Sequence, residues 1–175
     1  MLPSSRAAPC HRNRRQWLRL LTTLGLAHVT SLAAQPMQPE LVGSTPDGRR
    51  FRLSEQAGRV VMVFYWSTDC AVCRDKMGEL RANLGGWARQ PFTLIGVNMD
   101  RRLQDFRVHE DLVRQTIAPG RRFDSLWAAQ PGFIDTLGAP TRLPEACLID
   151  KQGRLVERYS GRIPAQAWDR IAELL

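Results

Sequence analysis

Cysteine is scarce in this chain, with four residues among 175. Cys10 precedes an apolar run near the amino terminus, so it is not the lipidated cysteine of a lipoprotein signal. Only Cys70, Cys73 and Cys147 follow that run, and three cysteines are too few for a disulfide scaffold. Because Cys70 and Cys73 are separated by only two residues, their spacing indicates chemistry rather than cross-linking of the fold.

A second close pair of metal ligands is also missing. A zinc site needs four ligands and typically contains two close pairs. Beyond Cys70 and Cys73, the chain after its basic leader offers only Cys147, His28 and His109. We therefore predict no metal and no bound cofactor. Half of a zinc site and an inert structural disulfide stay open as alternatives for the cysteine pair.

The sequence has no run of Lys and Arg with interleaved aromatic residues, although its formal net charge is +8. Residues 1–34 hold five arginines and no Asp or Glu, so the rest of the chain carries only +3. Elsewhere the arginines alternate with acidic residues. This distribution predicts a mixed, solvated surface and no binding to nucleic acid.

Residues 1–34 have the pattern of an export signal. A basic stretch precedes a moderately apolar run from Trp17 to Leu32, which is followed by small residues. Arg14 and Arg15, followed closely by an aromatic residue, resemble a twin-arginine signal. The apolar run is interrupted by polar residues and is weaker than a stable spanning helix. We favour a cleaved signal over a permanent anchor and predict a periplasmic location, with membrane contact only through this segment if it is retained.

The patterns in residues 35–175 predict a single α/β domain. The run from Val60 to Trp66 is apolar, β-branched and aromatic, as in a strand buried on both faces. An amphipathic helix follows from Cys70 to about Gly86. The other expected elements are an amino-terminal β-hairpin at 40–43 and 50–53, a strand at 92–99, a helix at 103–117, a βα insertion with a strand at 121–127 and a short helix at 133–137, a second hairpin at 145–149 and 154–159, and a helix from about 164. Their order implies a central mixed β-sheet flanked by helices.

The cysteine pair lies where the buried strand gives way to the helix. At a helix amino terminus, unpaired backbone N–H groups and the helix dipole stabilise an anion, so Cys70 is predicted to ionise more readily than a free thiol. Cys73 lies one turn further along the same face and can close a disulfide with Cys70. We predict that Cys70 attacks a disulfide and that Cys73 resolves the mixed disulfide.

With these features the chain resembles the TlpA/ResA-like branch of the thioredoxin superfamily, the exported thiol-disulfide oxidoreductases. The resemblance covers roughly residues 40–175 and rests on Trp66-x-x-Cys70-x-x-Cys73-Arg74, on Leu143-Pro144 before a strand, and on the 148–154 hairpin with a later Gly161. It implies a thioredoxin-like fold and a cis bond before Pro144. It also implies that Leu143 and Pro144 face the cysteines and bind a substrate segment, with the Leu143 backbone open to strand-like pairing.

Two positions beside the cysteines depart from the family pattern. Asp69 stands where most members have Trp; it is a good helix N-cap, but its charge opposes thiolate formation on Cys70. Lys76 stands where many relatives have Glu. It either favours the thiolate of Cys73 or is an ordinary solvated lysine.

Three further residues have competing interpretations. Trp66 is either a substrate contact or a core residue beside the motif. Cys147 is predicted to be a small core residue rather than a third redox cysteine. His109 lies among charged residues and is predicted to lie on the surface of its helix.

We predict an envelope thiol-disulfide oxidoreductase that reduces protein disulfides. The resemblance implies substrates such as apocytochrome c or metalloproteins during their maturation, and an upstream membrane thiol as electron donor. A peroxidase would need Pro and Thr where Val63 and Ser67 stand, and a copper chaperone would need three residues between its cysteines. A non-catalytic thioredoxin-like binding module remains an alternative because of Asp69 and Lys76.

Overall fold

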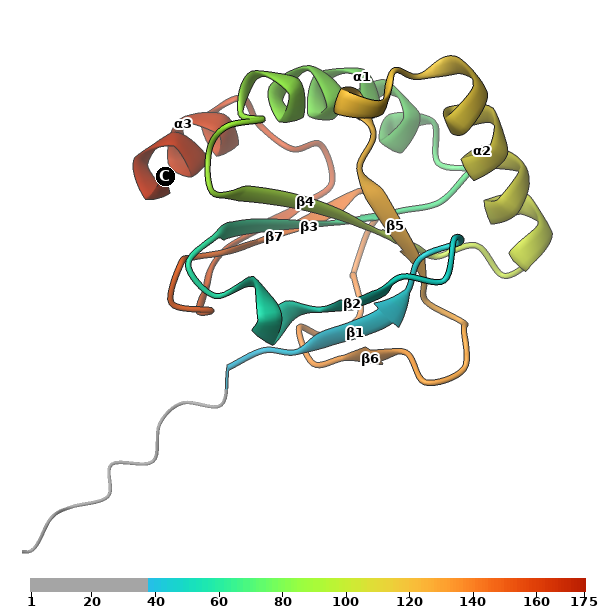
Figure 1. Cartoon of the computed structure of the whole chain (residues 1–175), viewed down its shortest axis with the longest axis horizontal. Coiled ribbons are helices and arrows are strands. Elements are labelled where there is room, and N and C mark those ends of the chain that lie inside the picture. The colour runs from blue at the N-terminus through green and yellow to red at the C-terminus, as the bar shows by residue number, and fades with distance from the viewer. Residues whose placement is uncertain (1–37) are drawn as a thin grey trace, which may run out of the picture. The chain divides into compact units, whose positions relative to one another are not determined.

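A five-stranded mixed sheet forms the centre of the part of the chain described by the computed structural model, residues 38–175 (Figure 1). The predictions for residues 1–34 lie outside this range. The strand order is β5-β4-β3-β7-β8. The strands are β3 (Val60–Trp66), β4 (Phe92–Asn98), β5 (Asp124–Trp127), β7 (Glu145–Ile149) and β8 (Leu155–Ser160). The prediction of a central mixed sheet is confirmed.

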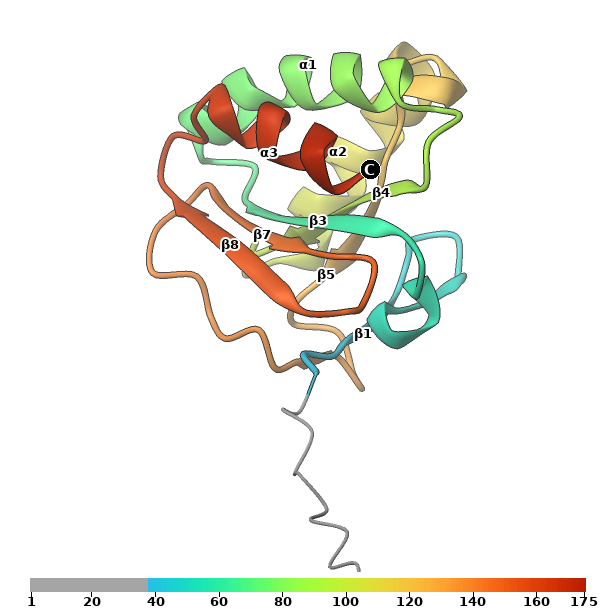
Figure 2. The same cartoon turned by 90° about the vertical axis from the view of Figure 1, so that its left-hand side faces the viewer.

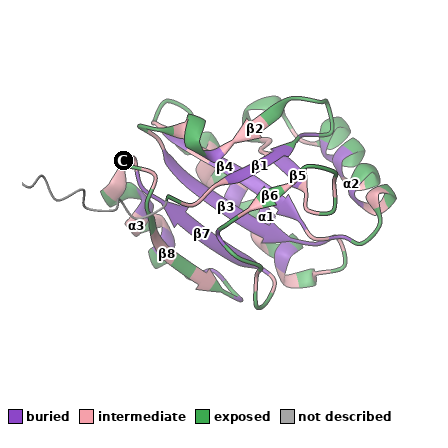
Figure 3. Ribbon diagram, turned by 90° about the horizontal axis from the view of Figure 1, so that it is seen from below, coloured by how far each residue is buried: buried purple, intermediate pink, exposed green. Residues whose placement is uncertain are grey.

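Strand β3 is the middle strand, and all seven of its residues are buried (Figure 3). It pairs in parallel with β4 along its whole length, from Val60 opposite Phe92 to Trp66 opposite Asn98. On its other side it pairs antiparallel with β7. A strand that has neighbours on both sides and cores on both faces must be apolar throughout, which explains the uninterrupted run in the sequence.

Three helices pack on one face of this sheet: α1 (Ala71–Gly86), α2 (Leu103–Thr116) and α3 (Gln166–Leu174) (Figure 2). Cys73, Met77 and Leu80 of α1 are buried there together with Phe106 of α2 and Ile171 of α3. We call this cluster the helical-face core. Among the helices of residues 38–175, none has the length and apolar character needed to cross a membrane.

A small three-stranded sheet, ordered β2-β1-β6, covers the opposite face (Figure 1). It consists of β1 (Leu41–Ser44), β2 (Arg50–Arg52) and β6 (Ile134–Asp135), and the 3-10 turn η1 (Leu53–Gln56) follows β2. Strands β1 and β2 form the predicted amino-terminal hairpin. Leu41 and Leu53 pack against Val63 and Cys147 of the central sheet, so the hairpin closes a second core.

The short helix predicted at 133–137 is wrong. Ile134 and Asp135 instead form β6, which pairs antiparallel with β1. The segment is bounded by Gly132 and Gly138, both at positive φ, and is therefore too short to repay the cost of nucleating a helix. The free edge of β1 offers hydrogen-bond partners instead, so the insertion contains β5, beyond the 3-10 turn η2 (Pro119–Arg121), and β6.

Packing of α1 on the sheet predicts a large difference between two leucine truncations. Leu80 of α1 is 0% exposed, whereas Leu112 of α2 is 56% exposed. Because Leu80→Ala leaves a cavity in the helical-face core, we expect it to lower the free energy of unfolding by about 2–5 kcal/mol. Leu112→Ala, the matched control, should change it by less than about 0.5 kcal/mol. Urea denaturation of the oxidised protein measures both, and equal effects would contradict this packing.

Candidate active site

The antiparallel pairing of β3 with β7 brings together the two segments that the sequence singled out. Tyr65, near the end of β3, lies opposite Glu145, the first residue of β7. The chain leaves β3 toward Cys70 and enters β7 directly from Pro144. The cysteine segment and the proline segment therefore meet at one end of the sheet although they are far apart in sequence.

Cys70 and Cys73 form a disulfide across the first turn of α1, with their Cα atoms 5.2 Å apart. Cys70 is the N-cap residue of the helix, and its Sγ accepts a hydrogen bond from the backbone N–H of Cys73 at 3.1 Å. The first turn of the helix contains no acidic residue. When the pair is reduced, the N–H groups and the dipole at this helix end therefore favour negative charge on the Cys70 sulfur.

The two cysteines differ in their exposure. Cys73 is fully buried in the helical-face core, whereas Cys70 is half-buried and packs at the edge of that core. A partner can reach Cys70 from solvent, whereas Cys73 is closed to solvent. The predicted roles of an attacking and a resolving thiol require this asymmetry.

The peptide bond between Leu143 and Pro144 is cis, as the family resemblance implies. Pro144 is buried, and its carbonyl oxygen accepts a hydrogen bond from the N–H of Gly161 at 2.7 Å. Gly161 has a φ of 84°, a conformation that favours glycine. Within the described residues, no hydrogen bond engages the backbone of Leu143. The Leu143 backbone is therefore free to pair with another chain.

A groove of about 480 Å³ lies beside the turn that precedes Cys70. We call it the redox-site groove. Its lining residues come from the turn before Cys70, from the segment after β4, from the start of α2 and from the turn before Pro144: Ser67, Thr68, Asp69, Met99, Asp100, Arg101, Arg102, Asp105 and Leu143.

Asp69 is exposed, and it accepts a hydrogen bond from the Ser67 hydroxyl at 2.5 Å. The prediction that Asp69 caps the helix is wrong, because Cys70 is the N-cap residue and its own sulfur accepts the cap hydrogen bond. Asp69 nevertheless immediately precedes Cys70 and lines the redox-site groove. A partner that approaches Cys70 through the redox-site groove would therefore pass the Asp69 carboxylate.

Lys76 lies next to groups other than the cysteine sulfurs. Its Nζ is 2.7 Å from Glu79 Oε2 and 5.9 Å from the ring centroid of Trp168. Burial alone would raise the pKa of Glu79, but the Lys76 ammonium and the Trp168 indole N–H hold it below its usual value. The positive charge that the sequence offered to Cys73 is thus largely neutralised by Glu79.

Of the two interpretations of Trp66, the core residue is confirmed and the substrate contact is wrong, because its side chain is 0% exposed. The indole packs within the helical-face core, with its ring centroid 6.4 Å from Phe106 and 4.6 Å from His109. His109 is half-buried against this ring, so the prediction that it lies on the surface is wrong as well. Trp66 is therefore a core residue at the end of β3.

Asp100, a buried carboxylate two residues after the end of β4, is absent from the predicted site residues. Its Oδ1 accepts the backbone N–H of Thr68 at 2.8 Å, and its Oδ2 accepts the side-chain amide of Asn98 at 2.9 Å. Asp100 thereby fixes the turn that leads to Cys70. The sequence feature that could have identified Asp100 is its position just after a buried parallel strand, because functional groups gather at the carboxyl ends of such strands.

Glu145, the buried residue directly after Pro144, is also absent from the predicted site residues. It forms an ion pair with Arg158, and it accepts hydrogen bonds from the Thr141 N–H and hydroxyl at 3.2 and 3.3 Å. These contacts tie the segment before Leu143 to the sheet. The sequence feature that could have identified Glu145 is that it is the one charged residue at the start of an otherwise apolar strand.

Cys147 is a free, buried cysteine in the core between the two sheets, which confirms its predicted core position. Burial raises the pKa of its thiol to about 12. Nearby, burial raises the pKa of Tyr65, whose hydroxyl donates to Asp135 at 2.9 Å. Within residues 38–175, no group of three or more His, Cys, Asp or Glu side chains is arranged to hold a metal ion.

The fold and the site together define a class. A mixed sheet flanked by helices, a Cys-x-x-Cys disulfide at a helix start and a cis-proline segment beside it are the features of thioredoxin-like thiol-disulfide oxidoreductases. A model of the AhpC/TSA family matches residues 35–159, and the chain belongs to this family.

Solved structures share the thioredoxin-like fold. The chain is similar to a thiol:disulfide interchange protein of the thioredoxin family from Chlorobium tepidum TLS, at 24% identity and a TM-score of 0.62, covering 80% of this chain and 96% of that one. It is also similar to a DsbF homologue from Corynebacterium diphtheriae, at 21% identity and a TM-score of 0.61, covering 79% and 85%. A third similar structure is StoA from Bacillus subtilis, at 14% identity and a TM-score of 0.57, covering 76% and 96%.

Burial of Cys147 predicts that its thiol is inert in the folded protein. With a pKa of about 12, the thiol stays protonated at pH 8, and the thiolate is the nucleophile. We expect iodoacetamide to leave Cys147 unmodified in the oxidised native protein and to label it fully in urea. Peptide mass spectrometry locates the label. Rapid labelling of Cys147 under native conditions would contradict its burial.

Proposed function

We propose that this chain is an exported thiol-disulfide oxidoreductase of the periplasm, and that it reduces disulfide bonds in protein substrates through Cys70 and Cys73. The observation that carries this proposal is the arrangement of the two sulfurs. The Cys70 sulfur accepts the N-cap hydrogen bond of a helix, Cys70 is half-buried, and Cys73, one turn further along, is fully buried.

The proposed reaction begins with the reduced pair. The Cys70 thiolate attacks one sulfur of the substrate disulfide, so that a mixed disulfide forms and the other substrate sulfur leaves as a thiolate, which takes up a proton. The Cys73 thiol then loses its proton and attacks Cys70, which forms the Cys70–Cys73 disulfide and releases the second substrate thiol. Two electrons pass from the protein to the substrate. An upstream membrane thiol would return them to the oxidised pair.

We assign substrate binding to Leu143 and Pro144. The free backbone groups of Leu143 can pair with an extended substrate segment, as a strand added to an exposed edge does. Pro144 itself offers no N–H, and its carbonyl is already bonded to Gly161, so Leu143 carries the pairing.

The export pattern of residues 1–34 supports a periplasmic location. One similar structure is named as a thiol:disulfide interchange protein of the thioredoxin family, which supports disulfides of other proteins as substrates. Maturation of cytochrome c or of metalloproteins is the setting that the family resemblance suggests. In such a setting the protein would act as a reductant.

Single cysteine variants test the assigned roles. Because Cys73 resolves the mixed disulfide, Cys73→Ala should accumulate disulfide-linked partners through Cys70, visible as bands that disappear on reduction. Cys70→Ala should trap none and should lose at least about 100-fold of the rate of insulin disulfide reduction, since the attacking thiol is gone. Cys147→Ala is the control and should keep the wild-type rate.

If wild-type protein reduced no disulfide and Cys73→Ala trapped no partner, the chain would act as a binding module without turnover. Trapping by Cys70→Ala instead of Cys73→Ala would reverse the two roles.

The charges beside the pair predict unequal effects on the reactivity of Cys70. Removing the Asp69 charge favours the neighbouring thiolate, so Asp69→Asn should raise the rate of Cys70 alkylation at pH 6 by about twofold to fivefold. Lys76→Gln should change this rate by less than about twofold, because Glu79 already neutralises the lysine. Stopped-flow alkylation of the reduced protein measures both, and a larger effect at Lys76 than at Asp69 would refute this assignment.

A further inference from the structure

The geometry points to redox partners that carry acidic side chains beside their disulfide. This inference rests on the proposed function and names the substrate class for the same site. Its basis is a set of four exposed arginines around Cys70–Cys73, which we call the arginine rim: Arg74, Arg101, Arg142 and Arg162.

Two members of the rim lie on the side of the cysteine turn and the groove. Arg74 directly follows Cys73, and its guanidinium donates to the Thr68 carbonyl at 2.6 Å, which holds its charge over the turn before Cys70. Arg101 lines the redox-site groove, as do Thr68 and Leu143. A chain lying in the groove would therefore pass Arg101 and the Thr68 turn to which Arg74 is bonded.

The other two members flank the cis-proline segment. Arg142 immediately precedes Leu143, and its Cδ lies 3.3 Å from the position that a Cβ on Gly161 would occupy. Arg162 immediately follows Gly161, whose N–H is bonded to Pro144. The cis-proline segment, where the substrate backbone is proposed to pair, is therefore flanked by two arginines.

The charge of the rim is not neutralised by the protein. Within residues 38–175, none of the four arginines lies within ion-pair distance of a carboxylate, although other arginines of the chain do, such as Arg102 with Asp105 at 3.3 Å. These free guanidinium groups are available to a partner.

Carboxylates near the site reduce this charge without reversing it. Asp69 and Asp75 are exposed, and no cationic side chain pairs with them in the described structure. Asp105 is paired with Arg102, and Asp100 is buried and hydrogen-bonded. Within residues 38–175, four arginines without a carboxylate partner therefore stand beside three carboxylates without a cationic partner, Asp69, Asp75 and the buried Asp100. A surplus of this sign attracts acidic segments and raises their rate of encounter.

Three synthetic peptides test the inference. Each carries one intramolecular disulfide, flanked by Asp, by Ser or by Lys residues. Pre-reduced protein is mixed with each peptide in a single turnover, so the Cys70–Cys73 dithiol supplies both electrons. Rates with dithiothreitol alone correct for the intrinsic reactivity of each peptide. We expect the Asp peptide to be reduced at least about tenfold faster than the Lys peptide at low salt. In 1 M NaCl the ratio should fall to about twofold, because screening shortens the range of the charges to about 3 Å.

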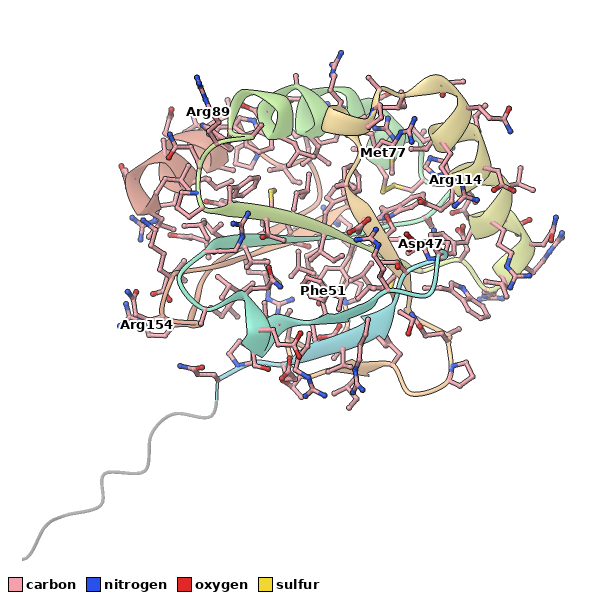
Figure 4. The ribbon with its side chains drawn as sticks, viewed as in Figure 1. Asp47, Phe51, Met77, Arg89, Arg114 and Arg154 are labelled. Atoms are coloured by element: carbon pink, nitrogen blue, oxygen red, sulfur yellow. A yellow bond between two sulfur atoms is a disulfide. The ribbon has the colours of Figure 1, made fainter. Side chains whose placement is uncertain are left out.

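Variants assign the preference to the rim. Arg142→Glu/Arg162→Glu should remove or invert the preference for the Asp peptide, and Arg142→Gln/Arg162→Gln should weaken it. Unchanged reduction of the Ser peptide shows that each variant is folded and active. Arg89→Glu is the matched control: Arg89 is exposed and lies beyond the far end of α1 (Figure 4), and its reversal should leave the peptide ratio as in the wild type.

The outcomes separate the two proposals. If the Ser peptide is reduced but the Asp and Lys peptides react equally, the inference is wrong and the proposed function stands. If the Glu variants keep the wild-type preference, the preference does not come from the rim and the inference is also wrong. If no peptide is reduced, the proposed function fails and the inference fails with it.

Discussion

The antiparallel pairing of β7 with β3 is the constraint on which the site depends. It sets the start of one strand beside the end of the other, so the turn to Cys70 and the cis-proline segment share one edge of the sheet. A shift of one residue in this register would move every side chain of the strand to the opposite face. Because β3 is buried on both faces by side chains of different size, such a shift would disrupt two cores. Core packing therefore fixes the geometry of the site.

Within this arrangement, the amino-terminal end of α1 supplies the two cysteines, Cys70 and Cys73. The Cys73 N–H donates to the Cys70 sulfur. Lys76 stands where many TlpA/ResA-like proteins have Glu, and it is paired with Glu79. The carboxylate that could relay a proton at this position is therefore replaced by a lysine. In the proposed function, stabilisation of the Cys70 thiolate therefore comes from backbone groups, which a substitution of side chains does not remove. Asp100 contributes indirectly, since it holds the Thr68 N–H and with it the turn before Cys70.

Local patterns were enough to predict the central strand, α1, both hairpins and the cysteine pair, because periodicity and turn residues record burial and chain reversal directly. Local patterns failed for residues whose structure depends on contacts with segments distant in the sequence. The segment at Ile134 became a strand because β1 offered an edge. Trp66 is buried because α2 covers it, and no local signal shows which helix lies above a strand end. Asp100 and Glu145 were missed because their hydrogen-bond partners come from other segments.

Asp69 stands where most TlpA/ResA-like proteins have Trp. In the proposed function, this charged residue and the arginine rim determine how a partner is held. A reductase forms a covalent mixed disulfide with its substrate, so the non-covalent contacts need only bring the sulfurs together and then release the product. Buried apolar contacts slow dissociation, whereas exposed charges act mainly on the rate of association. A charged rim around a half-buried sulfur therefore suits brief encounters, in which the disulfide bond itself, rather than a large interface, holds the partner during transfer.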